Sequence, residues 1–109
     1  MRRMTTTLDR LEATIRARRN GDPAASYVAR LTADGRARMA RKLGEEAVET
    51  VVAAMEGDAA AVTSEAADLI FHLAVLLADM GLSLDAVMAE LDRREGVSGI
   101  AEKAARAKE

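Results

Sequence analysis

The sequence contains no cysteine and no tryptophan, and only one proline, one tyrosine and one phenylalanine. Without cysteine the chain can form neither disulfides nor a thiolate metal site, which fits a reducing compartment, so we expect a cytoplasmic protein. Half of the residues are hydrophobic. Because aromatic residues are so few, this apolar content is mostly alanine, valine, leucine and methionine, which pack well in helices.

Charge and hydropathy argue against two kinds of partner. The formal net charge of −2 gives no sign of the basic stripe that nucleic-acid binding requires, so we expect no nucleic-acid partner. The basic residues near the N-terminus are not followed by the apolar run of a signal peptide. The most apolar stretch, residues 69–78, contains His72 and is too short to span a bilayer, so we expect no membrane association.

Capping residues and glycines divide the sequence into about five expected helices, and no segment alternates with the period of a strand. The expected helices cover about 8–19, 27–34, 36–56, 59–80 and a segment from 84 onward. Four of them follow a residue that can cap a helix: Thr7, Ser26, Asp58 and Ser83. The tail, 96–109, is expected to be either a flexible extension or a short terminal helix.

These elements predict an all-α protein, an antiparallel helical bundle in a single domain covering 1–109. The loops around Gly57 and Gly81 are only a few residues long, so the third, fourth and fifth helices should pack antiparallel as neighbours. A chain of this length buries only about two-thirds of its unfolded surface. We therefore expect a homodimer.

Acidic residues follow one side of each of the two long helices. On the third helix, charged residues occupy an arc of about 100° beside an apolar stripe of Met39, Leu43, Val48, Val51, Val52 and Met55. That arc holds Arg38, Lys42, Glu45, Glu46 and Glu49. On the fourth helix, an arc of about 60° holds Glu65, Asp68, His72 and Asp79, although the rest of this helix is apolar. Unpaired buried carboxylates are costly, so these acids need a partner.

A divalent cation is one such partner. Glu46 with Glu49, and Glu65 with Asp68, are pairs at i, i+3 spacing that can face each other across two antiparallel helices. Carboxylate oxygens suit Mg²⁺ or Mn²⁺ rather than zinc. Simpler interpretations stay open at this point: a solvated ion-pair face on the third helix, a hydrogen-bonded core histidine at position 72, and a solvated Asp79.

The acidic motifs resemble those of a known group of enzymes. Residues 42–49 (KLGEEAVE) and 65–68 (EAAD) resemble the E-E-x-x-E … E-x-x-D metal motif of the all-α nucleotide pyrophosphohydrolases, which include MazG-type enzymes and dimeric dUTPases. Ser26-Tyr27, Leu31, Gly35 and the run from Asp68 through His72 to Leu77 give a finer resemblance, to the phosphoribosyl-ATP pyrophosphatases, over about 8–94. Leu43 and Phe71 depart from that pattern, where a β-branched residue and a tyrosine are expected.

The resemblance implies a MazG-like fold and the hydrolysis of phosphoribosyl-ATP to phosphoribosyl-AMP and pyrophosphate, the second step of histidine biosynthesis. It also implies roles for eleven residues. The Mg²⁺ ligands would be Glu46, Glu49, Glu65 and Asp68, with Mn²⁺ as a substitute ion. Glu45 would orient or deprotonate the attacking water, or add a ligand, and Lys42 with Arg38 or Arg41 would neutralise phosphate oxygens. The remaining substrate-binding residues would be Ser26, Tyr27 and His72.

Two other functions compete with this interpretation. A housekeeping, MazG-like nucleoside triphosphate pyrophosphohydrolase would have the same metal site and a different base pocket. A non-catalytic helical dimerisation module would use the acids only as structural ion pairs. Comparing the hydrolysis of phosphoribosyl-ATP with that of dUTP and other nucleoside triphosphates tests the first alternative. A Mg²⁺ titration of the melting temperature tests the second, because a bound ion stabilises the fold by mass action.

Overall fold

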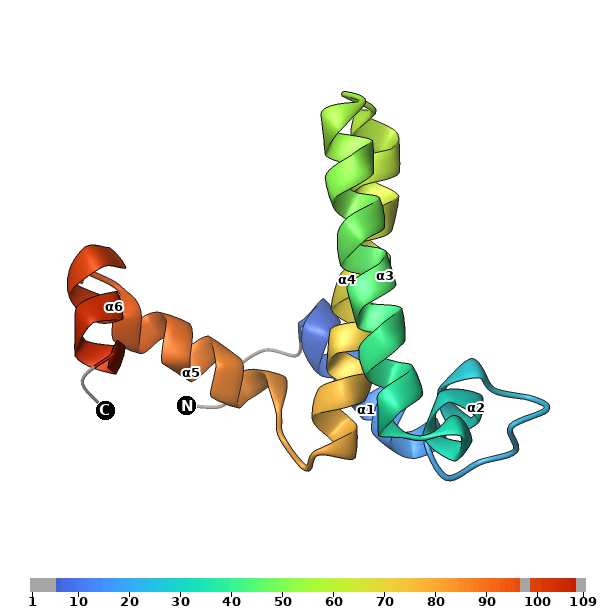
Figure 1. Cartoon of the computed structure of the whole chain (residues 1–109). Coiled ribbons are helices and arrows are strands. Elements are labelled where there is room, and N and C mark those ends of the chain that lie inside the picture. Colours follow the sequence, from blue (N-terminus) through green and yellow to red (C-terminus); the bar gives the residue numbers. More distant parts are fainter. Residues whose placement is uncertain (1–5, 97–98, 108–109) are drawn as a thin grey trace.

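The computed structural model describes residues 6–96 and 99–107, and within these ranges it contains six α-helices and no strand. The helices are α1 (Thr7–Arg18), α2 (Tyr27–Asp34), α3 (Arg36–Met55), α4 (Ala59–Asp79), α5 (Leu84–Arg94) and α6 (Gly99–Ala107), as Figure 1 shows. The all-α prediction is confirmed. Of the two alternatives for the tail, the short terminal helix is the one observed.

Local capping signals set the helix starts. Ser26, Asp58 and Ser83 each accept a hydrogen bond from the backbone amide three residues later, at 3.2, 3.0 and 3.1 Å, as predicted. The predicted cap of α1 is wrong by one residue, because Thr6 rather than Thr7 takes this position. Thr6 has an aspartate three residues later, and the two side chains bond each other's backbone amides in a capping box.

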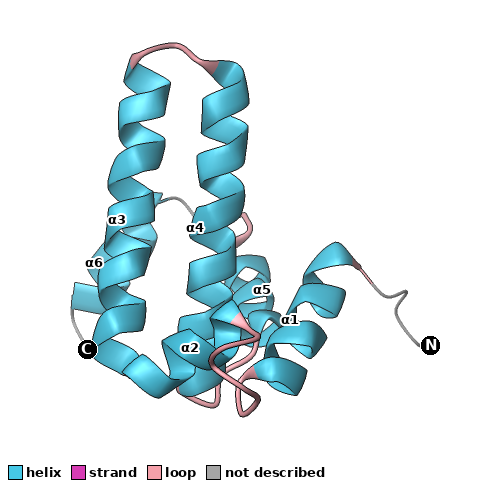
Figure 2. Cartoon of the chain, turned by 90° about the vertical axis from the view of Figure 1, so that its right-hand side faces the viewer, coloured by secondary structure: helices cyan, strands magenta, loops and turns pink. Residues whose placement is uncertain are grey.

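Helices α3 and α4 form a long antiparallel hairpin, and they lie side by side along its length in Figures 1 and 2. A turn at Gly57 joins them, and its φ of 73° lies in the left-handed region that glycine adopts without strain. The hairpin tip projects beyond the other helices (Figure 1). The two acidic arcs predicted from the sequence therefore lie on neighbouring helices.

The hydrophobic core lies at the base of this hairpin. Its largest fully buried side chains are Ile15 of α1, Leu31 of α2, Met39 of α3 and Val75 of α4. Helices α1 and α2 thus cover only the part of the hairpin where α3 begins and α4 ends. Among the described residues, the part nearer the tip packs mainly through contacts between α3 and α4.

Helix α5 does not pack along α4, so the prediction of three antiparallel neighbours is wrong for this helix. It turns away from the hairpin (Figure 1) and contacts α1 instead. The reason is a contact between distant residues: the Glu12 carboxylate accepts a 2.7 Å hydrogen bond from the backbone amide of Leu84. Leu84 itself is buried in the core, which fixes the start of α5 beside α1.

The sequence suggested that the apolar stripe of α3 faces the core along its whole length. In the structure, only its first part does. Val48, Val51, Val52 and Met55 are 62%, 61%, 49% and 83% exposed. Within the described part of the chain, this half of the stripe has only α4 beside it. A single copy of the chain therefore leaves an apolar surface uncovered on the hairpin.

Helix α4 is long and apolar enough, by length and composition, to cross a membrane. Core helices of soluble proteins pass the same test. Helix α4 packs along α3, buries Val75, and carries Glu65 and Asp68 in its middle, so it is a core helix.

Candidate metal centre

Three of the four predicted metal ligands come together between α3 and α4. One carboxylate oxygen from each of Glu46, Glu49 and Glu65 lies within 4.8 Å of the others. Two come from successive turns of α3 and the third from α4, as the i, i+3 spacing and the hairpin require. Glu46 is buried, Glu65 is half-buried and Glu49 is exposed, so the cluster is open to solvent on one side.

This acidic cluster is electrostatically strained. A hydrogen bond with the Glu49 carboxyl, then burial, then the neighbouring Glu46 carboxyl raise the pKa of Glu65 from 4.5 to about 7. In addition, Oε2 of Glu46 and Oε2 of Glu65 are buried without a hydrogen-bond partner among the described residues. A buried carboxylate oxygen without a donor is unfavourable. The two carboxylates therefore lack part of the compensation that a cation between the helices would supply.

Lys42 supplies part of the compensating charge. Its Nζ lies 3.6 Å from Oε1 of Glu45 and 3.9 Å from Oε1 of Glu46. The ion-pair interpretation of this helix face is thus correct for Glu45, whose side chain is 48% exposed. It is insufficient for the cluster as a whole, because one ammonium group faces several carboxylates and leaves the buried Oε2 of Glu46 unpaired.

Two of the predicted residues lie apart from this cluster. Asp68, one turn after Glu65 on α4, is exposed and does not belong to the group of three. Arg41 is also exposed, and it makes no ion pair within the described ranges. The roles of Asp68 as a fourth ligand and of Arg41 as a phosphate contact remain predictions.

His72 links α4 to α2. Its Nδ1 lies 2.7 Å from the backbone carbonyl oxygen of Asp68, which can only accept, so Nδ1 carries the proton. In the neutral ring, Nε2 then accepts a 2.9 Å hydrogen bond from the Tyr27 hydroxyl. The buried imidazole also meets the rings of Tyr27 and Phe71 edge-on, with centroids 5.7 and 5.2 Å away. His72 is thus a hydrogen-bonded core histidine that positions Tyr27, and it contacts the backbone of Asp68 rather than its carboxylate.

The remaining predicted residues border α2. Ser26 uses its hydroxyl to cap this helix, and its predicted contact with substrate stays a prediction. Tyr27 and Arg38 line a cavity together with Leu31 and two residues that the sequence analysis missed, Arg30 and Asp34. No sequence signal distinguishes these two from ordinary charged residues on a solvated helix face.

The sequence suggested that Asp79 is only solvated, but in the structure it is paired. Its carboxylate accepts hydrogen bonds from Arg36 at 2.8 Å and from Arg19 at 3.1 Å. These arginines, Arg36 foremost, lower the pKa of Asp79 below its usual 3.8. Asp79 therefore ties the end of α4 to the start of α3 and the end of α1, and it has no part in the acidic cluster.

Comparisons with known proteins agree with this geometry. A family model described as phosphoribosyl-ATP pyrophosphohydrolase matches residues 8–95. A phosphoribosyl-ATP pyrophosphatase of Rhizorhabdus wittichii is 67% identical, over 96% of this chain and 99% of its own length. Proteins of the same name from Erythrobacter litoralis and Novosphingobium aromaticivorans are 65% and 62% identical, over 92% and 91% of this chain and 96% and 92% of their own lengths. The acidic cluster and the pocket on α2 both lie inside the matched region, and the chain belongs to the phosphoribosyl-ATP pyrophosphohydrolase family.

Proposed function

We propose that this chain hydrolyses phosphoribosyl-ATP to phosphoribosyl-AMP and pyrophosphate, as a Mg²⁺-dependent cytoplasmic enzyme of histidine biosynthesis. Family membership supports the substrate, because relatives above 60% identity bear this activity in their names. The observation that carries the chemistry is the convergence of Glu46, Glu49 and Glu65 within 4.8 Å. A housekeeping nucleotide pyrophosphohydrolase would use the same cluster, but nothing in the comparisons favours it.

The acidic cluster fits Mg²⁺ by its donor set. All three groups offer carboxylate oxygens, the ligands that this hard cation prefers, and no histidine nitrogen faces the cluster among the described residues. Two buried carboxylate oxygens of the cluster have no hydrogen-bond donor within the described part of the chain, so a positive charge there would be favourable. Asp68 lies one turn after Glu65 on α4, at the spacing of a paired ligand, so we retain it as a fourth ligand. Mn²⁺ would bind the same oxygens.

The residues around the cluster then have distinct roles. When bound, Mg²⁺ supplies positive charge that neutralises the triphosphate and the charge that develops on it during hydrolysis. Glu45 is exposed beside the cluster, where it can orient the attacking water and take its proton. Lys42 holds Glu45 in place and offers its remaining donors to phosphate oxygens.

The test is an assay of pyrophosphate release from phosphoribosyl-ATP with Mg²⁺, with and without a chelator. We expect release that depends on Mg²⁺ and a preference for phosphoribosyl-ATP over ATP and dUTP. Glu49→Ala should reduce turnover at least about a hundredfold while leaving the helical circular-dichroism signal intact. Glu95→Ala, an exposed glutamate beyond α5, is the matched control and should keep full activity. Full activity in Glu49→Ala would remove this residue from the metal site.

We also propose that the enzyme is a homodimer that covers the exposed apolar residues of the hairpin. The chain exposes 7707 Å², whereas a monomer of its mass exposes about 5,800 Å². Its radius of gyration is 16.2 Å, against about 13 Å for a compact chain of 100 residues. Val48, Val51, Val52 and Met55 fall within an arc of about 100° on α3, so one helix of a second copy can cover all four.

Light scattering on a sizing column tests the dimer. Val51→Asp should convert the wild-type dimer to a monomer, because a charge in an apolar interface loses its hydration without gaining a partner. Leu91→Asp places the same charge at a similarly exposed apolar residue of α5, 54% exposed against 61% for Val51, and should leave the dimer intact. A wild-type protein that is monomeric at every concentration would contradict the proposal.

A further inference from the structure

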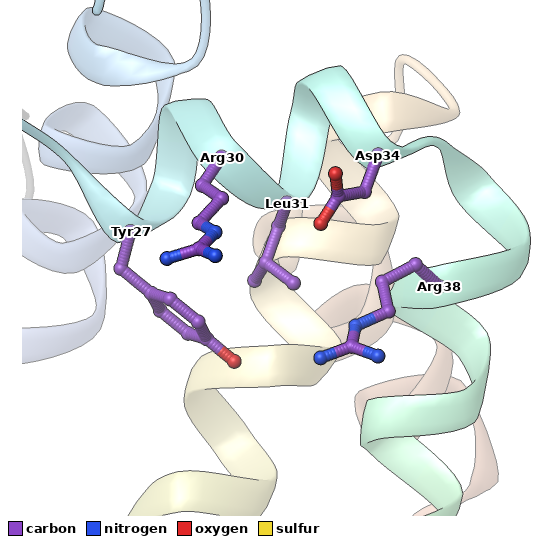
Figure 3. A pocket seen from close by; sticks show the side chains of 5 residues that line it. All are labelled: Tyr27, Arg30, Leu31, Asp34 and Arg38. Carbon is purple, nitrogen blue, oxygen red and sulfur yellow. The ribbon is translucent and has the colours of Figure 1, made fainter. Parts of the chain in front are cut away.

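A polar cavity beside α2 takes no part in the metal-site chemistry. It has a volume of about 450 Å³ and is lined by Tyr27, Arg30, Leu31, Asp34 and Arg38. Figure 3 shows the guanidinium groups of Arg30 and Arg38 reaching the same space from α2 and α3, with the Tyr27 side chain beside them. The carboxylate of Asp34 borders this space as well.

The two arginines carry more positive charge than the one carboxylate of the cavity offsets. Two other arginines, Arg19 and Arg36, form ion pairs with Asp79. In contrast, Arg30, Asp34 and Arg38 make no ion pair and no side-chain hydrogen bond within residues 6–96 and 99–107. Two guanidinium groups against one carboxylate leave the pocket with a net positive charge, which suits an anion.

Two tracks of side chains connect this pocket to the acidic cluster. On α3, Arg38, Lys42 and Glu46 follow one another at four-residue spacing, so they share one side of the helix. Arg38 precedes Glu46 by eight residues, which is about 12 Å along the helix axis. Toward α4, Tyr27 of the pocket bonds His72, and His72 bonds the backbone carbonyl oxygen of Asp68, one turn after the cluster residue Glu65. A ligand with anionic groups at both ends can therefore bind the pocket and the cluster together.

Phosphoribosyl-ATP is such a ligand. Its triphosphate lies at one end, a phosphate monoester lies at the other, and two riboses and a purine separate them. We propose that the α2 pocket binds the phosphoribosyl group: Arg30 and Arg38 hold its phosphate, and Asp34 accepts hydrogen bonds from its ribose hydroxyls. This inference rests on the proposed function and makes Arg30 a residue that distinguishes phosphoribosyl-ATP from ATP.

The composition of the pocket favours the phosphoribosyl end over the triphosphate. Planar guanidinium groups match phosphate oxygens in a bidentate geometry. A carboxylate beside them would repel the highly charged triphosphate, but it is the usual acceptor for ribose hydroxyls in nucleotide sites. The triphosphate already has Lys42 and the acidic cluster about 12 Å away.

Binding measurements by calorimetry without Mg²⁺ separate the two ends. The probes are phosphoribosyl-AMP, which carries the second phosphate, and AMP, which lacks it. Wild-type protein should bind phosphoribosyl-AMP more tightly than AMP. Arg30→Ala should weaken phosphoribosyl-AMP binding about tenfold or more, the usual effect of losing a hydrogen bond to a charged group, and leave AMP binding unchanged. Arg18→Ala, which removes an exposed arginine of α1, should alter neither affinity.

Kinetics with Mg²⁺ give a second measurement. Arg30→Ala should raise KM for phosphoribosyl-ATP about tenfold with little change in kcat, and Arg30→Lys should recover part of the loss. Arg38→Ala should behave in the same way, so the test still holds if one of the two variants does not fold. Equal weakening of phosphoribosyl-AMP and AMP, or no wild-type preference between them, would overturn the inference. Absence of pyrophosphate release by the wild-type enzyme would instead overturn the proposed function.

Discussion

The raised pKa of Glu65 predicts that Mg²⁺ and protons compete for the acidic cluster. Without the metal, Glu65 titrates near 7, mainly because its protonated form is favoured by the Glu49 carboxyl. Mg²⁺ requires carboxylates without protons. Below about pH 7, therefore, the ion must displace a proton from the cluster before it can bind.

The size of this effect follows from the titration of a single group. With a pKa of about 7, Glu65 is protonated in about 0.9 of the molecules at pH 6 and in about 0.1 at pH 8. The apparent Mg²⁺ affinity should fall about tenfold between pH 8 and pH 6, with about 0.9 proton released per ion at pH 6 and about 0.1 at pH 8.

The metal-free protein should show the opposite dependence in its stability. The pKa of Glu65 is higher in the folded chain than its ordinary 4.5. The folded state therefore binds more protons than the unfolded state between these values, and stability is lost as the pH rises from 4.5 through about 7. Glu65→Gln removes the titrating group, so this variant should be more stable than wild type without metal at about pH 8.

Calorimetry in buffers of different ionisation enthalpy measures both the affinity and the protons released. Wild-type protein and Glu65→Gln would be compared at about pH 6, 7 and 8, with Glu95→Gln as the control for loss of an exposed glutamate. Glu65→Gln should bind Mg²⁺ weakly and without the proton release. If wild-type protein binds Mg²⁺ at the lowest pH without releasing a proton, or if Glu65→Gln keeps the pH dependence, the cluster is not the metal site.

Two further predictions concern side-chain contacts between helices outside the cluster. Tyr27→Phe removes the hydrogen bond to His72 and should lower the free energy of unfolding by about 1 kcal/mol, measured by urea denaturation. Asp79→Asn should cost about 1–3 kcal/mol, since it leaves Arg19 and Arg36 without their carboxylate. Because the pKa of Asp79 is lowered below 3.8, its stabilisation is present above that value and is lost as the pH falls through the lowered pKa. Acid denaturation curves should differ between wild type and Asp79→Asn in this range, and identical curves would contradict the role assigned to this residue.

Much of the helical framework could be predicted from local sequence because capping is a local interaction. Ser26, Asp58 and Ser83 each act on an amide three residues away, which any reader of the sequence can locate. The acidic cluster was accessible for a similar reason. A short turn at Gly57 makes its two helices antiparallel neighbours, so acids on their facing arcs come close, as three of the four predicted ligands do.

Other features depend on contacts that sequence spacing does not encode. The direction of α5 is set by Glu12, which lies 72 residues before the amide that it accepts from. The α2 pocket depends on the angle between α2 and α3, which is set by the φ of 100° at Gly35. The sequence identifies this glycine as a helix end, but not the direction in which the next helix leaves. Arg30 and Asp34 share a cavity with Arg38 only because α3 leaves α2 in this direction.

Helix α3 combines three tasks by dividing its surface and its length. Its acidic arc faces α4 and accumulates negative charge, which raises the pKa of Glu65 and leaves oxygens unpaired. Its apolar arc from Val48 to Met55 faces outward. Near its start, α3 directs Arg38 into the cavity beside α2. The acidic arc and the apolar arc are both unfavourable for an isolated chain. The acidic arc needs a cation, and the apolar arc needs another surface to bury it. Since both lie on the part of the hairpin that the core does not support, metal binding and association with a second copy would stabilise the same segment.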